Sequence, residues 1–335
     1  MSLRYVNQTV ALSDVELGVM ISINILFSFT GTVGNLAVCF AFILCRNLRN
    51  TMNIFIFSLA CSDLLVCLVA QPMFITRLFR NPQADHVTTI SEDIRSRLTW
   101  ISLLASIGNL LGVTMDRYFI IADPLRYAAR VTTNTACVFV AVVWTFATTL
   151  GALTLYNRNA RYIGQIYVVV LLAGMIIPLY CRILCIARRH ARLIHSFYNR
   201  VQTSHSDKTN TLAPRTRRPS VQKADRNSLK TVGIISSIFV IGWFPLLILP
   251  FIYRAEGNDK SAILNAFQWA NTLALCSSAC NPIVYSWRDR RFRKVLTVNY
   301  EKWKARRSVS GPFTTGMNSE KVEMKTCVRT VTQPT

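Results

Sequence analysis

Seven long apolar segments constrain the fold of this chain more than any other feature of its sequence. A helix needs roughly 20 mainly apolar residues to cross the hydrocarbon core of a bilayer, and each segment reaches that length. Only 16% of the 335 residues are charged, against about 25% in soluble domains. The sequence therefore predicts an all-α membrane protein whose residues 18–287 form a seven-transmembrane helix bundle. The predicted spans are about 18–45, 52–76, 97–122, 132–156, 162–187, 229–253 and 261–287.

The basic residues are divided unequally between the two sides of this predicted bundle. Of the 38 lysines and arginines, 29 lie on one side: after spans one, three and seven, and between spans five and six. Basic loops remain in the cytoplasm, so we expect the N-terminus outside the cell and the C-terminus inside. Topology and attraction to anionic membrane lipids account for the net charge of +22, and we expect no nucleic-acid partner.

The segments outside the spans differ in composition. Residues 1–17 are expected to be extracellular and to lack a cleavable signal peptide, with a glycosylation sequon at Asn7. Residues 288–304 place apolar side chains at helical spacing among basic ones, which predicts a short amphipathic juxtamembrane helix. Residues 305–335 are rich in serine and threonine, and we predict a disordered cytoplasmic tail with phosphorylation sites.

Few polar residues interrupt the spans, and ionisable groups at such positions are costly. Asp63 lies near the middle of span two, and Ser106, Ser277 and Asn281 lie in spans three and seven. If these side chains converge, their oxygens suit a hard cation such as Na⁺, or a buried proton. A hydrogen-bonded carboxylate that only fixes helix packing is an equal alternative. The spans contain no set of His, Asp and Glu residues suited to catalysis, so we do not expect an enzyme.

Asp116 and Arg117 are adjacent at the inner end of span three, where long side chains reach the interface. Neighbours on a helix do not face each other, so we expect a second partner for Arg117. Asp225, before span six, is the candidate. A charge pair between two helix ends would act as a latch, and anchoring at the interface is the alternative. Pro178, Pro245 and the proline at 282 predict kinks that could serve as hinges.

Seven motifs occur in a fixed order along residues 18–300. They are GTVGN in span one, LACSD in span two, DRY in span three, Trp144 in span four, Pro178 in span five, WFP in span six and NPIVY in span seven. Their order and spacing resemble those of class A, rhodopsin-like G-protein-coupled receptors. The resemblance implies a plasma-membrane receptor that transduces an extracellular ligand into heterotrimeric G-protein activation. It also implies arrestin and receptor kinases as partners.

The resemblance further implies roles for individual residues. Asp116, Arg117, Tyr118 and Asp225 would form the G-protein coupling region and its latch. Asp63, Ser106, Ser277 and Asn281 would form an allosteric sodium pocket, with no other cofactor. The activation switch would comprise Trp243, Phe239, Ile107, Pro178, Pro245, Asn281, Pro282 and Tyr285. The ligand pocket would comprise Thr99, Trp100, Leu103, Leu246, Leu247, Gln268 and Asn271.

Three positions depart from the usual pattern of that family. Glu92 replaces the cysteine of the outer disulfide, Gly242 replaces the cysteine before Trp243, and Ile186 replaces a tyrosine in span five. With its short second outer loop, the chain is most similar to the branch of melanocortin, cannabinoid, lysophospholipid and adenosine receptors. A constitutive receptor without ligand, or a partner subunit, is an alternative function. An ion-coupled transporter is a further alternative function, and the absence of internal repeats disfavours it.

The ligand is not identified by the sequence, and a peptide, a lipid or a small molecule all fit. Thr99 stands where amine receptors carry an aspartate, and Leu275 where opsins carry the retinal-binding lysine. We therefore expect neither a typical biogenic amine nor retinal. Four charged residues near the mouth are expected to be solvated end charges, with steering of a charged ligand as the alternative. They are Glu92, Asp93, Arg95 and Arg97.

Overall fold

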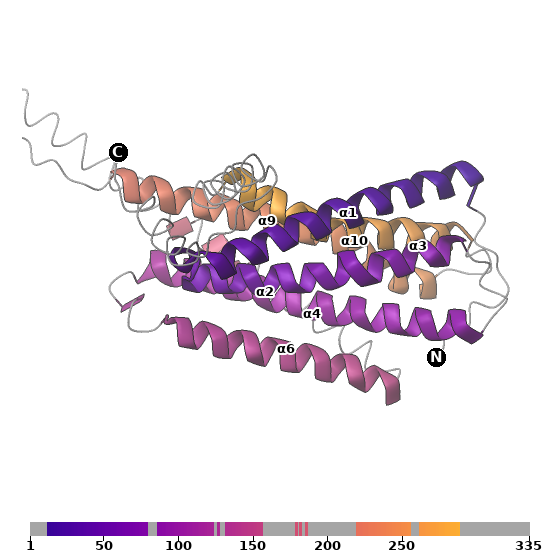
Figure 1. Cartoon of the computed structure of the whole chain (residues 1–335), viewed down its shortest axis with the longest axis horizontal. Helices are drawn as coiled ribbons and strands as arrows, with labels where there is room; N and C mark the ends of the chain where they lie inside the picture. Colours follow the sequence, from indigo (N-terminus) through magenta and orange to yellow (C-terminus); the bar gives the residue numbers. More distant parts are fainter. Residues whose placement is uncertain are drawn as a thin grey trace, which may run out of the picture.

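The fold is an elongated bundle of long helices lying side by side (Figure 1). The computed structural model describes residues 12–79, 86–123, 126–127, 131–156, 178–179, 181–182, 185–186, 219–255 and 261–288. Within these ranges the elements are all helical, which confirms the prediction of an all-α protein. The predicted amphipathic helix, the tail, most of span five and Asn7 lie outside the described residues.

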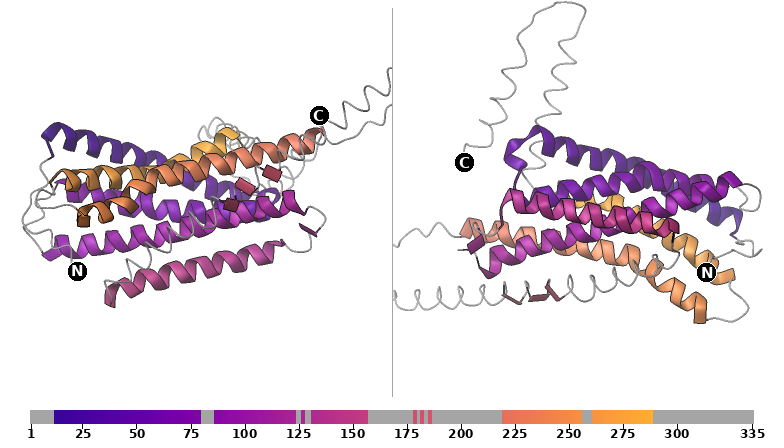
Figure 2. Two further views of the ribbon diagram at one scale, coloured as in Figure 1. Left: turned by 180° about the vertical axis from the view of Figure 1, so that it is seen from behind. Right: turned by 90° about the horizontal axis from the view of Figure 1, so that it is seen from below.

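The described helices follow one another up and down the bundle, as the two further views also show (Figure 2). They are α1 (Asp14–Leu44), a 3-10 turn η1 (Arg46–Leu48), α2 (Thr51–Leu65), a π-helical segment η2 (Val66–Ala70), α3 (Gln71–Phe79), α4 (His86–Ala122), α6 (Thr133–Tyr156), α9 (Pro219–Ala255) and α10 (Ser261–Arg288). Below, the inner end of the bundle is the end that carries Arg117, and the outer end is the opposite one.

Five helical stretches in the described part of the chain are long and apolar enough to cross a membrane. They are Asp14–Leu44, Thr51–Phe79, Asp93–Ala122, Thr133–Leu153 and Thr231–Ile252. The second of these comprises α2, η2 and α3, which form one continuous rod. Several polar residues of α10 are buried, namely Gln268, Thr272, Ser277, Ser278 and Asn281, as expected for a span whose polar side chains face its neighbours.

The central helix of the bundle is α4. Within its apolar window 78% of the residues are buried inside the protein, against 17% for α6 at the edge of the bundle (Figure 1). Leu103, Ile107 and Leu110 of α4 are almost fully buried in the largest apolar cluster. Val138 and Val142 of α6 are instead exposed, which suits a helix whose outer face meets lipid. The core therefore surrounds α4.

Local sequence explains where the first two long helices begin. Ser13 and Glu16 form a capping box at the start of α1: the Glu16 carboxylate accepts from the Ser13 backbone N–H at 2.9 Å, and the Ser13 hydroxyl accepts from the Glu16 N–H at 3.3 Å. Asn50 caps α2, because its side-chain oxygen accepts from the Asn53 N–H at 2.9 Å. The caps satisfy backbone groups that would otherwise lack partners.

Small residues let α1 approach α10 closely. A Cβ atom added to Gly34 would lie 2.8 Å from the Pro282 Cβ, and one added to Gly31 would lie 2.7 Å from the Ala279 Cβ. Nearby, the Asn35 side chain donates to the Ser278 carbonyl at 3.3 Å. The GTVGN segment thus acts as a packing surface for the middle of α10.

The described helices begin earlier than the apolar segments alone indicate. Helix α1 begins at Asp14, α4 at His86 and α9 at Pro219, whereas the corresponding predicted spans begin at 18, 97 and 229. Apolar content marks the part of a helix that crosses lipid, and hydrogen-bonded turns continue beyond it until the backbone meets a break. The π-helical turn at Val66–Ala70 had no counterpart in the sequence interpretation.

Candidate functional site

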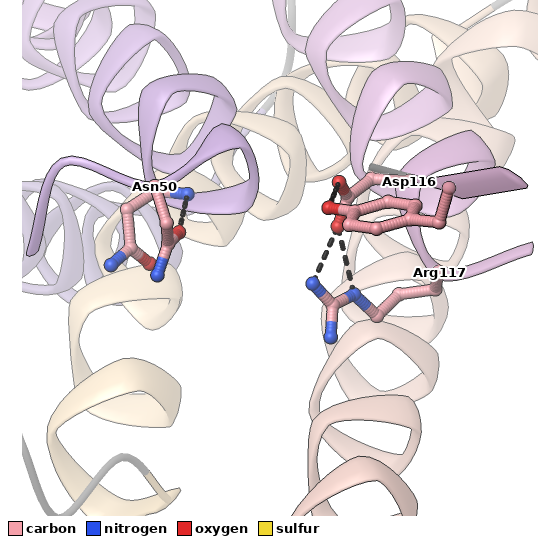
Figure 3. Close-up of polar contacts among 5 residues, drawn as sticks. Asn50, Asp116 and Arg117 are labelled. Carbon is pink, nitrogen blue, oxygen red and sulfur yellow. Dashed lines mark hydrogen bonds and ion pairs between the residues drawn. The ribbon is translucent and has the colours of Figure 1, made fainter. Parts of the chain in front are cut away.

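The inner end of α4 carries a buried carboxylate. Asp116 is 2% exposed, and its Oδ2 accepts from Arg117 Nε at 3.0 Å and from Arg117 Nη2 (Figure 3). The expectation that these neighbours do not face each other is therefore wrong. The Arg117 side chain is long enough to turn back along the end of the helix and reach Asp116. The rule that adjacent helical residues do not face each other takes no account of this reach. The pair neutralises both charges at this end of the bundle.

A tyrosine that the sequence interpretation did not single out completes this arrangement. The Tyr127 hydroxyl donates to Asp116 Oδ1 at 2.8 Å, so that both carboxylate oxygens have donors. Burial, together with the hydrogen bond to Asp116 and its negative charge, raises the pKa of Tyr127 to about 12, although the hydrogen bond with Thr51 and the positive charge of Arg117 act in the opposite direction. The phenol therefore remains protonated, and a donor, at physiological pH. No spacing rule connects residues 116 and 127, because the segment between them leaves the helix.

The other members of the predicted coupling region are less closely tied to the pair. Tyr118 is half-buried, with its ring 5.7 Å from that of Phe119 in an edge contact. The Asp225 side chain lies outside the described side chains, so its pairing with Arg117 stays a prediction. Asn50 caps α2 at a distance from the ion pair (Figure 3), and belongs to the scaffold around it.

In the middle of the bundle the structure brings Asp63 and Asn281 together. Asn281 Nδ2 donates to Asp63 Oδ2 at 2.7 Å, and the two residues are 1% and 6% exposed. Ser106 hydrogen-bonds Ser62, the residue before Asp63, with 2.9 Å between the hydroxyl oxygens. Ser277 donates to the Ala274 carbonyl at 2.7 Å. Of the predicted sodium residues, the structure thus brings Asn281 onto the Asp63 carboxylate, whereas the hydrogen bonds of Ser106 and Ser277 go to Ser62 and to the backbone of α10.

This donor set is chemically suited to sodium. A carboxylate, hydroxyl oxygens and the amide oxygen of Asn281 are hard ligands, which are those a small hard cation prefers. Asn281 uses its NH₂ group toward Asp63, which leaves its amide oxygen as a further possible ligand. The residues present therefore fit the ion.

The predicted switch residues of α4 and α9 share one apolar cluster. The rings of Phe239 and Trp243 lie 6.1 Å apart and are tilted by 31°, and both residues are buried in that cluster together with Ile107. Pro245 and Pro282 interrupt α9 and α10. Pro178 is exposed, and the Tyr285 side chain lies outside the described side chains. Of the predicted switch residues, the structure therefore brings Ile107, Phe239 and Trp243 together in one apolar cluster.

The residues of the predicted ligand pocket lie on facing helices of the outer half. Leu103 and Leu247 are buried in the central cluster, and Trp100 and Leu246 pack against it. Thr99 and Asn271 use their side chains to donate to the backbone carbonyls of Arg95 and Phe267, at 2.8 Å and 2.7 Å. Gln268 is 3% exposed, and its Oε1 atom has no partner among the described residues.

A groove of about 710 Å³ lies elsewhere, between α9 and α10. It is apolar, and its margins include the exposed side chains of Phe244, Ile248 and Leu273. None of the seven predicted pocket residues lines it. This groove therefore opens on the exposed side of α9 and α10, and it is distinct from the predicted ligand pocket.

The charges near the outer end are not all solvated. Arg97 forms an ion pair with Asp93 at 3.3 Å, and both side chains are partly exposed, as expected. Arg95 is only 7% exposed, and its Cζ atom lies 5.5 Å from the centre of the Phe74 ring. The expectation of a solvated end charge is therefore wrong for Arg95. The helix turn at this position directs the side chain toward α3 and not into solvent.

A second polar group that sequence reasoning missed joins α1, α3 and α10. Asn24 Nδ2 donates to Thr272 Oγ1 at 3.1 Å, and Gln71 Nε2 donates to Asn24 Oδ1 at 3.2 Å. All three residues are buried, and the Oε1 atom of Gln71 has no partner among the described residues. Asparagine and glutamine within otherwise apolar spans were the signal that could have found this network.

Comparisons with known proteins place these features in context. The sequence profile described as "7 transmembrane receptor (rhodopsin family)" matches residues 34–164 and 157–285. The mouse 5-hydroxytryptamine receptor 6 is 29% identical over 286 residues, which cover 74% of this chain and 63% of that receptor, just under two thirds of its length. The rat histamine H2 receptor is 30% identical over 78% of this chain and 73% of its own length. The mouse melanocortin receptor 5 is 24% identical over 84% of both chains.

Proposed function

The chain belongs to the rhodopsin family of seven-transmembrane receptors, and on this premise we propose that it converts the binding of an extracellular ligand into nucleotide exchange on a heterotrimeric G protein. Members of this family are signalling receptors and not enzymes, so the protein catalyses no covalent chemistry of its own. The wider seven-span, multi-pass membrane architecture follows from the same membership.

The observation that carries this proposal is the engagement of Asp116 on both of its oxygens. Arg117 and Tyr127 hold a carboxylate that is almost fully buried. While Asp116 neutralises Arg117, the guanidinium is not available to an acceptor on a G protein. A state in which the pair opens would present five N–H donors of a permanent cation at the inner end of the bundle. We assign Asp225 as the second partner of Arg117 in the closed state.

The apolar cluster provides a physical connection between the outer half and this latch. Leu103 and Leu247 from the predicted pocket pack in the same cluster as Ile107, Phe239 and Trp243. A ligand that displaces one of these side chains must repack the others, because protein interiors are close-packed. The prolines of α9 and α10 supply kinks at which a helix segment can tilt. A ligand that prefers the tilted packing shifts the population toward it by its differential affinity.

An allosteric sodium ion at Asp63 is part of the proposal. Asp63, Asn281, Ser106 and Ser277 would hold it, and the ion would supply a positive charge that stabilises a buried carboxylate. The contribution of the chain is to orient the carboxylate through Asn281 and to keep it out of water. Through this contact α2 and α10 are tied together at mid-bundle.

The ligand class is narrowed by two positions. Several relatives are named as amine receptors, including the serotonin and histamine receptors. In this chain Thr99 offers a hydroxyl that already donates to the Arg95 carbonyl, which is no counter-ion for an ammonium group. Leu275 offers no amine for a retinal Schiff base. We propose a ligand of another class.

The remaining assignments follow from the sequence and the family. We propose residence in the plasma membrane with the N-terminus outside, glycosylation at Asn7, and regulation by receptor kinases and arrestin through the serine- and threonine-rich tail.

Screening the full chain in cells against peptides, lipids and small molecules, with readouts for several G-protein pathways, tests the proposal. Epitope tags at both ends provide the topology control, since only the N-terminal tag should be accessible on intact cells. A ligand-dependent G-protein response is expected. Strong output without any ligand would favour the constitutive alternative, and an accessible C-terminal tag would refute the topology.

A further inference from the structure

We propose that Asn109 of α4 and Ser58 of α2 form a hydrogen-bond switch between two packings of the bundle. In the packing described above the two residues lie at the same level and share no hydrogen bond, and in the second packing α4 has turned so that they bond. This inference rests on the proposed function, because it identifies a pair of residues that sets the balance between the closed and the open state.

The first argument is the burial of Asn109 in the middle of α4. Asn109 is 0% exposed, and neither its Nδ2 nor its Oδ1 atom has a hydrogen-bond partner among the described residues. A side-chain amide carries two donor hydrogens and an acceptor oxygen. The large majority of buried polar side chains in native proteins have partners, and a buried group without one costs its full desolvation. The described packing is therefore destabilised at this residue.

The second argument is the register of α2 against α4, which two contacts fix. Ser62 and Ser106 share a hydrogen bond with 2.9 Å between their hydroxyl oxygens. A Cβ atom added to Gly112 would lie 2.6 Å from a ring carbon of Phe55. Residue numbers fall along α2 between these contacts while they rise along α4, so the two helices are antiparallel. Their midpoints between the two contacts therefore lie at the same level.

Ser58 and Asn109 occupy these midpoints. The Ser58 hydroxyl accepts from Trp144 Nε1 at 2.9 Å, a bond that ties α2 to α6 and fixes the position of the hydroxyl oxygen. A hydroxyl has one donor hydrogen and two lone pairs, and the bond from Trp144 uses one lone pair. Ser58 thus retains the groups with which to bond either atom of the Asn109 amide.

The surface of α4 near Asn109 suits a small turn of the helix. At Gly108 an added Cβ atom would lie 2.6 Å from Val143 of α6, so the α4 backbone meets its neighbour there without an interlocking side chain. Ser102 lies seven residues before Asn109 on the same face of α4, and its buried hydroxyl also has no partner among the described residues. Helix rotations and shifts of about 1–2 Å are a common part of switching transitions.

The same turn of α4 would act on the latch. Asp116 lies seven residues after Asn109, about two turns inward on the same face of the helix. Its Oδ1 atom accepts from the Tyr127 hydroxyl at 2.8 Å, and Tyr127 lies outside α4. A turn that carries Asn109 to Ser58 also carries Asp116 away from this fixed donor. The bond gained at mid-helix therefore favours the state in which Arg117 is released.

The test uses the purified full chain in lipid nanodiscs without G protein, and compares Asn109→Leu with the wild type. Leucine keeps the branching of asparagine and removes both unpaired polar atoms. Tm should rise by about 2–4 °C. Amide hydrogen exchange in residues 219–230, the inner part of α9, should become slower, because the open packing loses its bond and is populated less. A lower Tm, or exchange as fast as in the wild type, overturns the proposal.

Thr114→Val is the matched control. Thr114 is equally buried on the same helix, but its hydroxyl donates to the Leu110 carbonyl at 2.7 Å. This variant should neither raise Tm nor slow the exchange, and gains equal to those of Asn109→Leu would contradict the assignment to Asn109.

Two smaller variants keep the test decisive if Asn109→Leu fails to fold. Asn109→Ala leaves the same cavity in both packings, so exchange in residues 219–230 should still become slower. Ser58→Ala should slow that exchange as well, and the double variant should add nothing to the larger single effect, because both changes remove one bond. Unchanged exchange in Asn109→Ala, or additive effects of the two changes, would overturn the pairing.

The readouts separate this proposal from the proposed function. Tm and amide exchange are measured without G protein, so the switch can be supported while the chain never accelerates GDP release, in which case only the receptor function fails. Conversely, GDP release that the chain accelerates equally with and without Asn109→Ala would support the receptor and refute the switch.

Discussion

Tyr127 and Asp116 are joined by a hydrogen bond of 2.8 Å that holds the second oxygen of a carboxylate already engaged by Arg117. The tyrosine comes from the segment after α4, so the pair at the helix end depends on a residue outside that helix. The carboxylate is thereby fixed in the orientation that receives the guanidinium. We interpret Tyr127 as a positioning residue for the closed state of the latch.

Tyr127→Phe is therefore expected to raise basal nucleotide exchange. The loss of one hydrogen bond to a charged group weakens the closed state by about 1.5–3 kcal/mol at most, and a several-fold rise in basal output is the expected result. The assay is GTPγS binding in membranes at matched surface expression. Arg126→Gln is the control from the same segment, because its ion pair with Asp123 is long, at 3.9 Å, and exposed. Equal basal output in both variants would show that the Tyr127 contact does not bias the latch.

Sodium dependence follows from the contact between Asp63 and Asn281. If the ion binds at this carboxylate, replacing sodium by N-methylglucamine should change basal exchange in the wild type, and Asp63→Asn should remove that response. The measurement is GTPγS binding over a range of sodium concentrations at constant ionic strength. Ser22→Ala, on the exposed start of α1, is the control. A sodium response that persists in Asp63→Asn would place the ion elsewhere.

Two glycines of α1 should respond in opposite ways to the same substitution. At Gly31 an added Cβ would lie 2.5 Å from Cys67 Sγ and 2.7 Å from the Ala279 Cβ, whereas at Gly18 nothing lies within 4 Å. Gly31→Ala should destabilise the bundle by about 1–3 kcal/mol through overpacking. Gly18→Ala should be neutral or stabilising by up to about 1 kcal/mol. Thermal unfolding in detergent distinguishes the two, and a neutral Gly31→Ala would contradict the close approach of α1 to α10.

The capping box at the start of α1 predicts a pH dependence. The backbone N–H and hydroxyl of Ser13 donate to Glu16 and lower the pKa of its carboxyl below the ordinary value. Because the pKa of Glu16 is lower in the folded state than in the unfolded state, the capping box stabilises the fold fully above the unfolded-state pKa. This stabilisation is lost as the pH falls through the folded-state pKa. The protection of the amides in the first turn of α1 against hydrogen exchange, corrected for the intrinsic rate at each pH, should therefore decrease on acidification. Ser13→Ala should show low protection at every pH, and protection of the first turn that does not change with pH in the wild type would argue against the cap.

The sequence allowed some of these features to be predicted and not others, for physical reasons. The length of an apolar segment indicates a membrane span regardless of which helices pack against it, so the all-helical architecture could be predicted from the sequence. The closeness of Asp63 and Asn281 agrees with a family motif, which carries information about partners far apart in the chain. By contrast, the pairing of Arg117 with its own neighbour depends on a rotamer, and the burial of Arg95 depends on the ring of Phe74 from another helix. Helical periodicity gives the face of a residue but not what packs against it.

The central claim is that Arg117, held closed by Asp116, becomes the contact that drives nucleotide exchange. The most direct measurement is the rate of GDP release from a panel of purified Gα subunits with the wild-type chain and Arg117→Ala in nanodiscs, at matched surface expression in parallel cells. The account predicts that the wild type accelerates release from at least one Gα and that Arg117→Ala reduces this to the rate without receptor, while reaching the cell surface normally. GDP release that stays as fast with Arg117→Ala as with the wild type would contradict it.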